Sequence, residues 1–441
     1  MGKDVRKPAI FAQKSEMRIF KFGGASVKDA KAVENVGKIL KRYEDEPLVV
    51  VVSAMGKSTN ALEGIMEHFA SGDVANAMKS IDDLLLFHTT IINELFGKNS
   101  NGIHDEIGTF FDELRDRCSQ HFDGNYDFQY DQIISYGEVI STKIISAYLN
   151  LNQFKSEWVD AREVVRTNNR WREGRVDWDI TKSLIDKKLT PLFNEGKMIA
   201  VTQGFLGHNS DGSTTTLGRE GSDFTASIFA YCLDAKDVTI WKDVPGMLNA
   251  DPKYFDNTVL LEKISFKEAI ELAYFGASVI HPKTIQPLKR KKIPLHIKSF
   301  VHPDKKGSII QESLAFDQHI PSFIFKMDQI LISLTPKDFS FIVEENLERI
   351  FGYLNARKIR VNLMQNSAVS FSFVIDNSKV NLERLVEFFQ TDYLVKYNEH
   401  LELVTIRHYD DPTIDRVTIG KRVILEQKSR ETARMVIKNI V

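Results

Sequence analysis

The chain has 441 residues, of which 43% are hydrophobic and 27% charged, an ordinary balance for a globular protein of two or three domains. The formal net charge of −2 argues against a nucleic-acid partner, and no stretch is long and apolar enough to cross a membrane. The two cysteines, Cys118 and Cys232, lie far apart in the sequence, which argues against a disulfide and indicates a reducing, cytoplasmic compartment.

The N-terminal region is predicted to be a leader followed by a βαβ unit. Residues 1–16 lack the apolar core of a signal peptide, so we expect a disordered leader there. A strand is predicted at residues 18–22, a glycine turn at residues 23–24, and a helix from the apolar spacing of Val27–Leu40. The β-branched run Leu48–Val52 is typical of a strand buried on both faces, and a right-handed parallel connection is the default for such a unit.

Helices without convincing strands are predicted over residues 60–130, and we interpret this stretch as a helical insert packed beside a sheet. Alternating helices and strands resume at Ile133, with a helix predicted at residues 138–149. Further strands are predicted at residues 158–160, 199–202, 238–241 and 293–298. The pattern indicates an α/β domain over residues 17–310, with a mostly parallel central sheet flanked by helices.

A glycine-rich loop from Gly212 to Asp223 is the strongest candidate for an anion site. It contains hydroxyl side chains and Arg219, and apolar residues at helical spacing follow it, with Ser222 as the expected N-cap. Backbone N–H groups at the start of a helix point at an incoming anion, and an arginine fork suits a carboxylate or a phosphate. An ordinary flexible loop is the alternative interpretation.

After residue 310 the pattern changes to β-α-β-β-α with one more strand. The strands are predicted at residues 329–334, 361–363, 369–374 and 401–406, and the helices at residues 339–354 and 381–389. This order is that of a ferredoxin-like α+β domain, so residues 311–441 are expected to form a regulatory region. The charged tail from Thr413 has a helical pattern near residues 433–440.

Polar side chains follow the first two predicted strands of the sheet. Lys21 lies at the end of the first strand, and Ser53 and Thr59 come after the second. Ligands of open parallel sheets bind beyond the carboxyl ends of the strands, so Lys21 is placed where a phosphate would lie. A solvated lysine at a strand end is the competing interpretation.

Other motif classes find no support in the sequence. Gly56-Lys57-Ser58 resembles the end of a P-loop, but Val51 stands where that loop requires a glycine. No G-x-G-x-x-G follows a strand, and the 11 histidines show no metal-ligand spacing. A dinucleotide fold and a resident metal centre are therefore not expected.

Several sequence blocks occur in a fixed order along the chain. They are Lys21 to Val27 (Lys-Phe-Gly-Gly-Ala-Ser-Val), Gly137-Glu138, Arg166-Thr167-Asn168, Thr202 to Asp223, Trp241 to Lys253, and Phe275 to Pro282. Together these blocks resemble the aspartate kinases of the amino acid kinase superfamily. The C-terminal segment resembles the ACT domains that follow such kinases.

The resemblance implies transfer of the γ-phosphoryl group of ATP to the β-carboxylate of L-aspartate. The products would be 4-phospho-L-aspartate and ADP, in the first step of lysine, threonine and methionine biosynthesis. A carboxylate with a pKa of about 4 is already ionised at neutral pH, so no general base is needed. Catalysis then depends on positioning and on neutralising charge with cations, backbone donors and the Mg²⁺ that ATP carries.

The resemblance also assigns roles to residues of this sequence. Lys21 would neutralise the transferring phosphoryl group, and Glu138 and Asp223 are the other catalytic candidates, facing the substrate ammonium group or positioning the lysine. Arg219 would hold the substrate α-carboxylate, and the rest of the aspartate pocket would be Ser53, Thr59, Phe205, Ser222 and Glu138. The nucleotide would be bound by Lys21, Gly23, Gly24, Trp241, Lys242, Asp243, Gly246, Met247, Lys253 and Ser278.

A few positions depart from the usual family pattern. Ser278 stands where the family usually has a lysine that approaches the phosphates, whereas Lys242 and Lys253 replace the more usual threonine and arginine. A charge-assisted hydrogen bond contributes about 1.5–3 kcal/mol, so Ser278 is expected to weaken ATP binding unless Lys242 compensates. Ala25 replaces a threonine or serine, which we expect to be a mild change.

The ACT resemblance implies a homodimer or higher homo-oligomer that is subject to amino-acid feedback. Val361, Asn362 and Ser367 fall where lysine-sensitive relatives contact the effector, but Asn362 and Ala368 occupy positions that are often acidic there. The effector is therefore left open between lysine, threonine and none. Two other functions also stay open: another amino acid kinase of the glutamate type, and a catalytically weak amino-acid-sensing protein.

Overall fold

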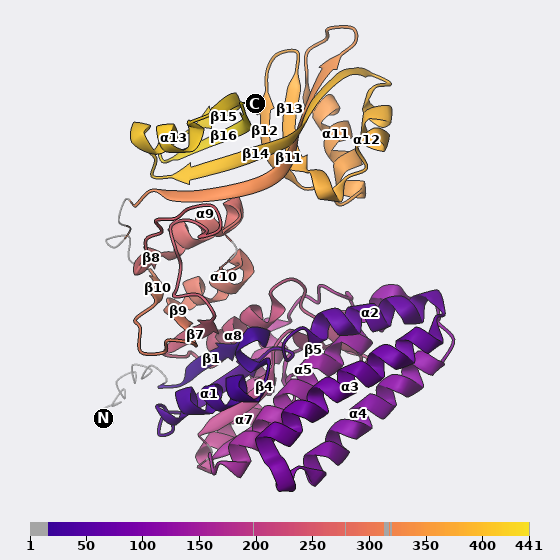
Figure 1. Cartoon of the computed structure of the whole chain (residues 1–441), viewed down its shortest axis with the longest axis vertical. Coiled ribbons are helices and arrows are strands. Elements are labelled where there is room, and N and C mark those ends of the chain that lie inside the picture. Colours follow the sequence, from indigo (N-terminus) through magenta and orange to yellow (C-terminus); the bar gives the residue numbers. More distant parts are fainter. Residues whose placement is uncertain (1–15, 197, 278, 313–316, 318–319, 441) are drawn as a thin grey trace, which may run out of the picture. The chain divides into compact units, whose positions relative to one another are not determined.

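The computed structural model describes residues 16–196, 198–277, 279–312, 317 and 320–440, so the predicted leader lies almost wholly outside the described residues (Figure 1). The chain forms two compact units. The first unit draws on the ranges Met1–Met247, Leu260–Ile270 and Ile280–Asp317. The second draws on Leu248–Val259, Glu271–Val279 and Gln318–Val441. The functional domain boundary placed at residue 310 stays a prediction.

An eight-stranded sheet forms the centre of the first unit, in the order β3-β4-β2-β1-β7-β9-β10-β8. Neighbouring strands are parallel except for the antiparallel pair β9 and β10. The strands are β1 (Arg18–Phe22), β2 (Leu48–Val52), β3 (Ser156–Val159), β4 (Ile199–Gln203), β7 (Asp237–Lys242), β8 (Lys263–Ser265), β9 (Leu295–Ser299) and β10 (Ser308–Gln311). The predicted mostly parallel α/β sheet is confirmed.

The register of this sheet brings several strand ends together. All five residues of β2 are buried, as expected for a β-branched strand between two helical layers. Lys21 of β1 pairs with Val51 of β2 on one side and with Ile240 of β7 on the other. The carboxyl ends of β1, β2 and β7 therefore share one edge of the sheet, where ligands of such sheets bind.

Helices cover the sheet and form the predicted helical insert. Their bounds are α1 (Ala30–Lys41), α2 (Ser58–Ser71), α3 (Val74–Phe96), α4 (Asn101–Ser119), α5 (Tyr126–Leu151), α6 (Ala161–Val164), α7 (Trp178–Asn194), α8 (Gly221–Cys232), α9 (Phe266–Phe275) and α10 (Pro282–Lys291). The helices α2, α3 and α4 pack side by side as a layer of their own (Figure 1). A short hairpin, β5 (Leu206–His208) and β6 (Thr214–Thr216), precedes α8.

The second unit is built on a six-stranded antiparallel sheet in the order β12-β13-β11-β14-β16-β15, consistent with ACT domains. The strands are β11 (Ser322–Pro336), β12 (Val361–Asn366), β13 (Phe371–Asp376), β14 (Tyr393–Arg407), β15 (Lys421–Lys428) and β16 (Thr432–Asn439). The helices are α11 (Glu344–Ala356), α12 (Leu382–Phe389) and α13 (Asp411–Thr418). A common core of β11, β13, α11 and α12 gives this unit its α+β character (Figure 1).

Two expectations for the C-terminal region were wrong. The segment near residues 433–440, predicted as a helix, is the strand β16, because it pairs with β14 on one side and β15 on the other. The helix expected from residue 339 begins only at Glu344, and Phe339 and Phe341 before it are both 69% exposed. Tertiary strand pairing thus overrides the local pattern in the first case.

Aromatic residues attach two short segments of the chain to the second unit. Phe255, in the segment Leu248–Val259, stacks on Phe323 of β11 with ring centroids 4.5 Å apart, and Arg416 of α13 lies 4.0 Å above the Phe255 ring. Phe275, in the segment Glu271–Val279, lies beneath Arg434 of β16 at 5.0 Å. Both segments therefore belong to the second unit, although the sequence places them within the range of the first.

Candidate active site

Two lysines converge on one buried aspartate at the shared edge of the first sheet. Lys21 is the penultimate residue of β1, Lys242 ends β7, and Asp223 lies in the first turn of α8. The Nζ of Lys21 is 2.6 Å from Oδ1 of Asp223, and the Nζ of Lys242 is 3.3 Å from Oδ2. The register of β1 and β7 brings these charges together although 221 residues separate the two lysines in sequence (242 − 21).

The aspartate stays ionised despite its burial. Burial alone would raise the pKa of Asp223, but the charges of Lys21 and Lys242 outweigh it and hold the pKa below its ordinary value. The cluster thus carries two cationic groups around one anionic group in a site that is 4% exposed at Asp223. Such a net positive cluster is suited to receive an anionic ligand.

The start of α8 differs in detail from the sequence prediction. The N-cap is Glu220, in a left-handed conformation with φ of 53°, and Ser222 lies inside the helix. The reason is close packing: a side chain at Gly221 would overlap the Phe205 ring, and one at Gly204 would overlap Ser222. The two glycines let the β4–β5 connection lie directly against the first turn of α8.

Arg219 is exposed on a loop whose two sides are anchored. On one side Leu217 N–H donates to the carbonyl of Phe205 at 2.8 Å. On the other, Gly218 adopts a φ of 76°, and a Cβ there would lie 3.1 Å from the carbonyl oxygen of Arg172. The exposed guanidinium is therefore presented from a well-supported loop.

Asp131 supports the same loop and was missed by sequence reasoning. Its carboxylate accepts hydrogen bonds from the backbone N–H of Thr216 at 3.0 Å, from the Thr216 hydroxyl at 2.7 Å and from the N–H of Arg172 at 2.9 Å. Burial raises the pKa of Asp131 to about 6, although these hydrogen bonds pull it down. A signal was available, because Asp131 lies seven residues before Glu138 and so on the same face of one helix.

Glu138 is a buried acid in the middle of α5, not a solvated acid at a helix start. The helix begins at Tyr126, and Glu138 is 3% exposed. Its Oε1 accepts a long hydrogen bond from the N–H of Ala54 at 3.4 Å, whereas Oε2 has no hydrogen-bond partner among the described residues. Burial raises the pKa of Glu138 to about 8, against the Ala54 N–H and the charge of Lys21.

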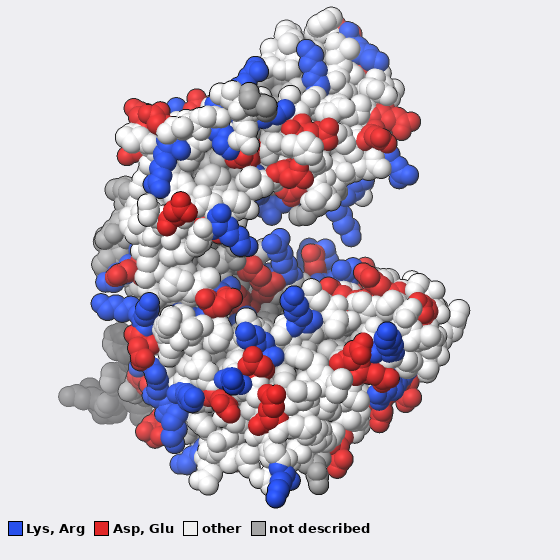
Figure 2. Space-filling model, viewed as in Figure 1, with Lys and Arg blue, Asp and Glu red and all other residues white. Residues whose placement is uncertain are grey.

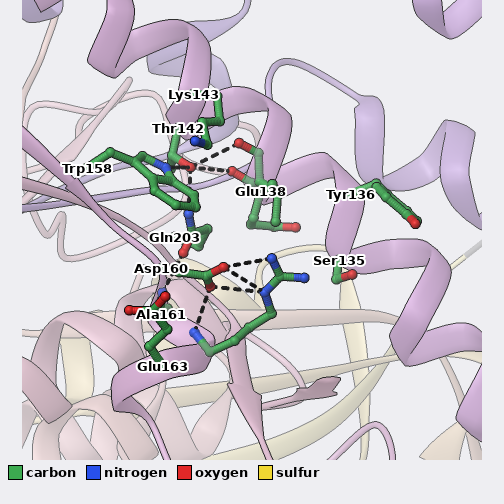
Figure 3. A network of polar contacts seen from close by, with 12 residues as sticks. Ser135, Tyr136, Glu138, Thr142, Lys143, Trp158, Asp160, Ala161, Glu163 and Gln203 are labelled. Atoms are coloured by element: carbon green, nitrogen blue, oxygen red, sulfur yellow. Dashed lines mark hydrogen bonds and ion pairs between the residues drawn. The ribbon is translucent and has the colours of Figure 1, made fainter. Parts of the chain in front are cut away.

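A polar network fixes the part of α5 that carries Glu138 (Figure 3). The Thr142 hydroxyl, one turn later, donates to the Glu138 carbonyl at 2.9 Å and accepts from Gln203 Nε2 at 2.9 Å and from Trp158 Nε1 at 3.0 Å. Gln203 Oε1 in turn accepts from the N–H of Ala161 at 2.6 Å. The network links α5 to β3, β4 and α6, so the rotation of α5 is fixed.

The glycine turn after β1 packs against the loop after β2. A Cβ at Gly24 would lie 2.8 Å from the carbonyl oxygens of Ala54 and Gly56, so no other residue fits there without movement. Ser53 is held through its carbonyl, which accepts from the Ser141 hydroxyl at 2.8 Å. Thr59 is half-buried in the first turn of α2. The structure thus brings Ser53, Thr59 and Gly24 to the edge where Lys21 lies.

The residues expected to bind the nucleotide differ in how exposed they are and in which neighbours hold them. The Trp241 side chain is 1% exposed and stacks on Phe22 with centroids 6.0 Å apart, so only its backbone is available to a ligand. Asp243 is exposed, and Met247 N–H is held by the Ser308 hydroxyl at 2.8 Å. Gly246 has a φ of 151°, and a Cβ there would lie 2.6 Å from the Ser308 oxygen. The loop is therefore built around a close approach that only glycine permits.

Three groups of predicted residues lie elsewhere. Lys253 is exposed in the segment of the second unit that Phe255 anchors. Ser278 lies outside the described residues. Of the effector candidates, which all lie in the second unit, Asn362 is buried, Val361 is half-buried and Ser367 is exposed.

The side chain of Asn362 is fully engaged inside its unit. Its Oδ1 accepts from Lys326 at 2.7 Å, and its Nδ2 donates to Gln329 at 2.8 Å and to Asp376 at 2.9 Å. Arg434 also donates to the Asn362 carbonyl at 2.6 Å. An amide held in this way leaves little hydrogen-bonding capacity for a ligand.

The surface charge, the metal-ligating side chains and the helix hydrophobicity of the described residues do little to narrow the kinds of ligand that the site could bind. Lysine and arginine side chains are intermixed with aspartate and glutamate over the described surface in view (Figure 2). Within the described ranges no cluster of three or more His, Cys, Asp or Glu side chains could hold a metal ion. No helix in the described part of the chain is long and apolar enough to span a membrane.

Comparisons with known proteins agree with one another. Residues 16–299 match the sequence pattern of the amino acid kinase family. The chain is 31% identical over 368 residues to the lysine-sensitive aspartokinase 3 of Escherichia coli (strain K12), covering 82% of this chain and 79% of that protein. It is 30% identical over 400 residues to the chloroplastic aspartokinase 1 of Arabidopsis thaliana, covering 88% of this chain and 68% of that protein.

Solved structures extend the likeness over nearly the whole chain. The crystal structure of E. coli aspartokinase III with lysine and aspartate, in the T-state, has a TM-score of 0.80 at 27% identity and covers 96% of both chains. The structure of the same enzyme with aspartate and ADP, in the R-state, has a TM-score of 0.76 at 26% identity, again covering 96% of both chains.

Proposed function

We propose a role for each residue of the site. The premise is that this chain belongs to the amino acid kinase family and, within it, to the aspartokinases. The chain is an ATP-dependent kinase that phosphorylates aspartate. The observation that carries the proposal is the cluster of Lys21, Asp223 and Lys242 at the carboxyl ends of β1 and β7.

In the proposed reaction an oxygen of the aspartate β-carboxylate attacks the γ-phosphorus of ATP. The bond from that phosphorus to the bridging oxygen of ADP breaks, and 4-phospho-L-aspartate forms without a proton transfer. Lys21 neutralises the transferring phosphoryl group, and Asp223 holds the lysine ammonium in place at 2.6 Å. Lys242, held on the other oxygen of Asp223, adds a second positive charge for the phosphates.

Both charged groups on the α-carbon of the substrate, the carboxylate and the ammonium, would be bound. Arg219, exposed on its anchored loop, forms two hydrogen bonds with the α-carboxylate. Glu138 accepts the α-ammonium group with the oxygen that lacks a partner in the described residues. The rest of the pocket would consist of Ser53, Thr59, Phe205 and Ser222. We expect aspartate to be preferred over glutamate, because the pocket must bring one carboxylate to Lys21 while both backbone groups are held.

The nucleotide would bind along the glycine turn and the loop after β7. Gly23, Gly24, Gly246 and the Trp241 and Met247 backbones would approach the phosphates and the nucleoside, together with Asp243, Lys253 and Ser278. A single exposed carboxylate, Asp243, suits a Mg²⁺ that is held mainly by phosphate oxygens and water. That ion, when bound, would neutralise charge on the β- and γ-phosphates.

The first test is acyl-phosphate formation from L-aspartate, trapped with hydroxylamine, in the parent and in Lys21→Met. The parent should turn over aspartate and not glutamate, and Lys21→Met should lower kcat by about 10²–10³-fold, the usual loss for a transition-state donor. Lys28→Met, an exposed lysine seven residues later, is the matched control and should stay within about twofold of the parent. Equal activity of Lys21→Met and Lys28→Met would refute the assigned role.

We also propose a cytoplasmic homodimer that pairs through the second unit and responds to an amino acid. Exposed apolar side chains gather before α11 and on the β12–β13 hairpin, namely Phe339, Phe341, Val343, Met364 and Val369. Light scattering should show a dimer, and Phe339→Ser with Phe341→Ser should shift it toward monomer. Because Asn362 is already bonded, lysine should inhibit less than it does in relatives with an acid at that position. Strong lysine inhibition of the parent would contradict this.

A further inference from the structure

Two lysines of α10 pack on α8 in the same way but at opposite ends. Lys283 lies over the ring of Phe224 at 4.6 Å, and Lys291 lies over the ring of Tyr231 at 4.5 Å. Between them, the Ser227 hydroxyl of α8 donates to the carbonyl of Thr284 at 2.7 Å, which fixes the two helices against each other. The two lysines differ in the hydrogen-bond or ion-pair partner of their ammonium groups.

Of these two lysines, Lys283 is the one that contacts the loop that carries Arg219. Its Nζ donates to the carbonyl of Leu217 at 2.7 Å, and Leu217 comes two residues before Arg219. The ring under Lys283 belongs to Phe224, the residue directly after Asp223. Lys291, in contrast, pairs with Asp234 beyond the far end of α8. Lys283 therefore contacts a residue close to Arg219, namely Leu217, and the residue next to Asp223, namely Phe224.

The bond to Leu217 completes the anchoring of a constrained loop. Leu217 is fully buried, its N–H is bonded to Phe205, and its carbonyl is bonded to Lys283. The next residues have positive φ values, 76° at Gly218 and 53° at Glu220, which need support from their surroundings. Burial also lowers the pKa of Lys283. Placing the charged ammonium here therefore costs desolvation free energy that a fully solvated lysine does not lose.

We propose that Lys283 is a positioning residue for aspartate binding: it holds the Leu217 carbonyl and so fixes the loop from which Arg219 grips the α-carboxylate. This inference rests on the role of Arg219 proposed above. In this proposal Lys283 acts through the Arg219 loop and not by direct contact with substrate, so its loss should weaken aspartate binding more than ATP binding.

The test compares Lys283→Met with Lys291→Met. Each change keeps an unbranched apolar side chain on the aromatic ring and removes one ammonium from α10. Lys283→Met should raise the KM for aspartate by about tenfold, the loss expected for one hydrogen bond to a charged group, with kcat and the KM for ATP within about twofold. Lys291→Met should leave all three constants within about twofold of the parent. Lys283→Arg, which can still donate to the carbonyl, should recover part of the aspartate affinity.

Equal effects of Lys283→Met and Lys291→Met, or a parallel rise of both KM values, would overturn the inference. A second readout does not depend on turnover: hydrogen exchange of residues 214–221 without substrates. Exchange there should be faster in Lys283→Met than in the parent and unchanged in Lys291→Met. If the parent fails to phosphorylate aspartate, the proposed function is wrong, whereas an unchanged exchange rate in Lys283→Met refutes the positioning role by itself.

Discussion

At the scale of single residues, the site works through charges that the fold holds at short range. Asp223 is the link, because each of its oxygens faces one lysine. Lys242 stands where relatives usually carry a threonine, so this chain has a cation that the family pattern does not require. Ser278, in contrast, stands where the family pattern has a lysine. Relative to the family pattern, the sequence therefore has an additional cation at position 242 and lacks one at position 278.

Ser278→Lys tests this exchange of charge. In the parent background it should lower the KM for ATP, by about 10- to 100-fold if a full charge-assisted hydrogen bond is gained. In a Lys242→Thr background, which should itself raise the KM for ATP, the same change should have a larger effect. Steady-state kinetics on the four proteins give the coupling between the two positions. Identical effects in both backgrounds would mean that Lys242 does not compensate for Ser278.

Glu138 predicts a dependence of stability on pH. Its pKa rises from the ordinary value to about 8 in the folded chain, so the folded protein holds a proton that the unfolded chain releases above about pH 4.5. The free energy of unfolding should therefore fall as pH rises between about 5 and 8, by up to about 1.4 kcal/mol per pH unit for this group alone. Glu138→Gln should remove that contribution.

Urea unfolding of the parent and of Glu138→Gln at several pH values measures this difference. The gain in stability of Glu138→Gln over the parent should grow toward pH 8 and be small near pH 5. The same variant should bind aspartate more weakly, since its amide cannot pair with an ammonium as a carboxylate does. A pH-independent difference in stability would show that Glu138 is already ionised in the folded protein.

At the scale of elements, α5 organises the site. It carries Asp131 and Glu138 on one face, seven residues apart, and the Thr142 network fixes its rotation against β3 and β4. Asp131 acts on the hairpin β5–β6 and on Arg172, and Glu138 reaches the loop after β2. One helix thus contacts both of the segments that are proposed to line the substrate pocket.

Asp131→Asn should show how much the hairpin depends on α5. The amide retains one acceptor oxygen but loses the charge that receives three hydrogen bonds, so we expect a loss of about 2 kcal/mol in unfolding free energy and a higher KM for aspartate. Asp127→Asn, one turn earlier and also paired with Arg172, is the control. As an exposed ion pair it should change stability by about 0–1 kcal/mol. Comparable losses in both variants would remove the special role of Asp131.

The elements also show what the sequence could and could not predict. The buried strand β2 and the helices of the insert follow directly from apolar periodicity, and Lys21, Arg219 and Asp223 follow from their motifs. The strands β15 and β16 were not predicted, because they are defined by long-range pairing, β16 with β14 and β15 with β16. The burial of Glu138 was missed because it depends on where α5 begins, twelve residues upstream (138 − 126). Long-range pairing and helix boundaries are the properties that local patterns specify least.

At the scale of the whole molecule, two segments that carry predicted nucleotide-binding residues are folded into the second unit. The segment with Lys253 is held by Phe255, and the segment that ends next to position 278 is held through Phe275. Changes in the second unit are therefore expected to affect these two segments directly.

Phe255→Ala tests the first of these attachments. Removal of a buried phenylalanine should cost about 3–5 kcal/mol of stability, hydrogen exchange should rise in residues 248–259, and the KM for ATP should rise more than that for aspartate. Tyr254→Ala, an exposed neighbour at 48% exposure, is the control and should have small effects on all three measurements. A similar rise of both KM values in Phe255→Ala would indicate general loosening.

The passage of the chain from one unit to the other and back also bears on modularity. A gene fragment that ends at residue 310 would stop one residue before the end of β10, and it would leave Phe255 and Phe275 without their contacts to Phe323 and Arg434. The second unit is therefore not a simple C-terminal extension, because it includes two segments that lie within the sequence range of the first unit. Recombination that exchanges the C-terminal region between relatives should succeed only when residues 248–259 and 271–279 are inherited along with it.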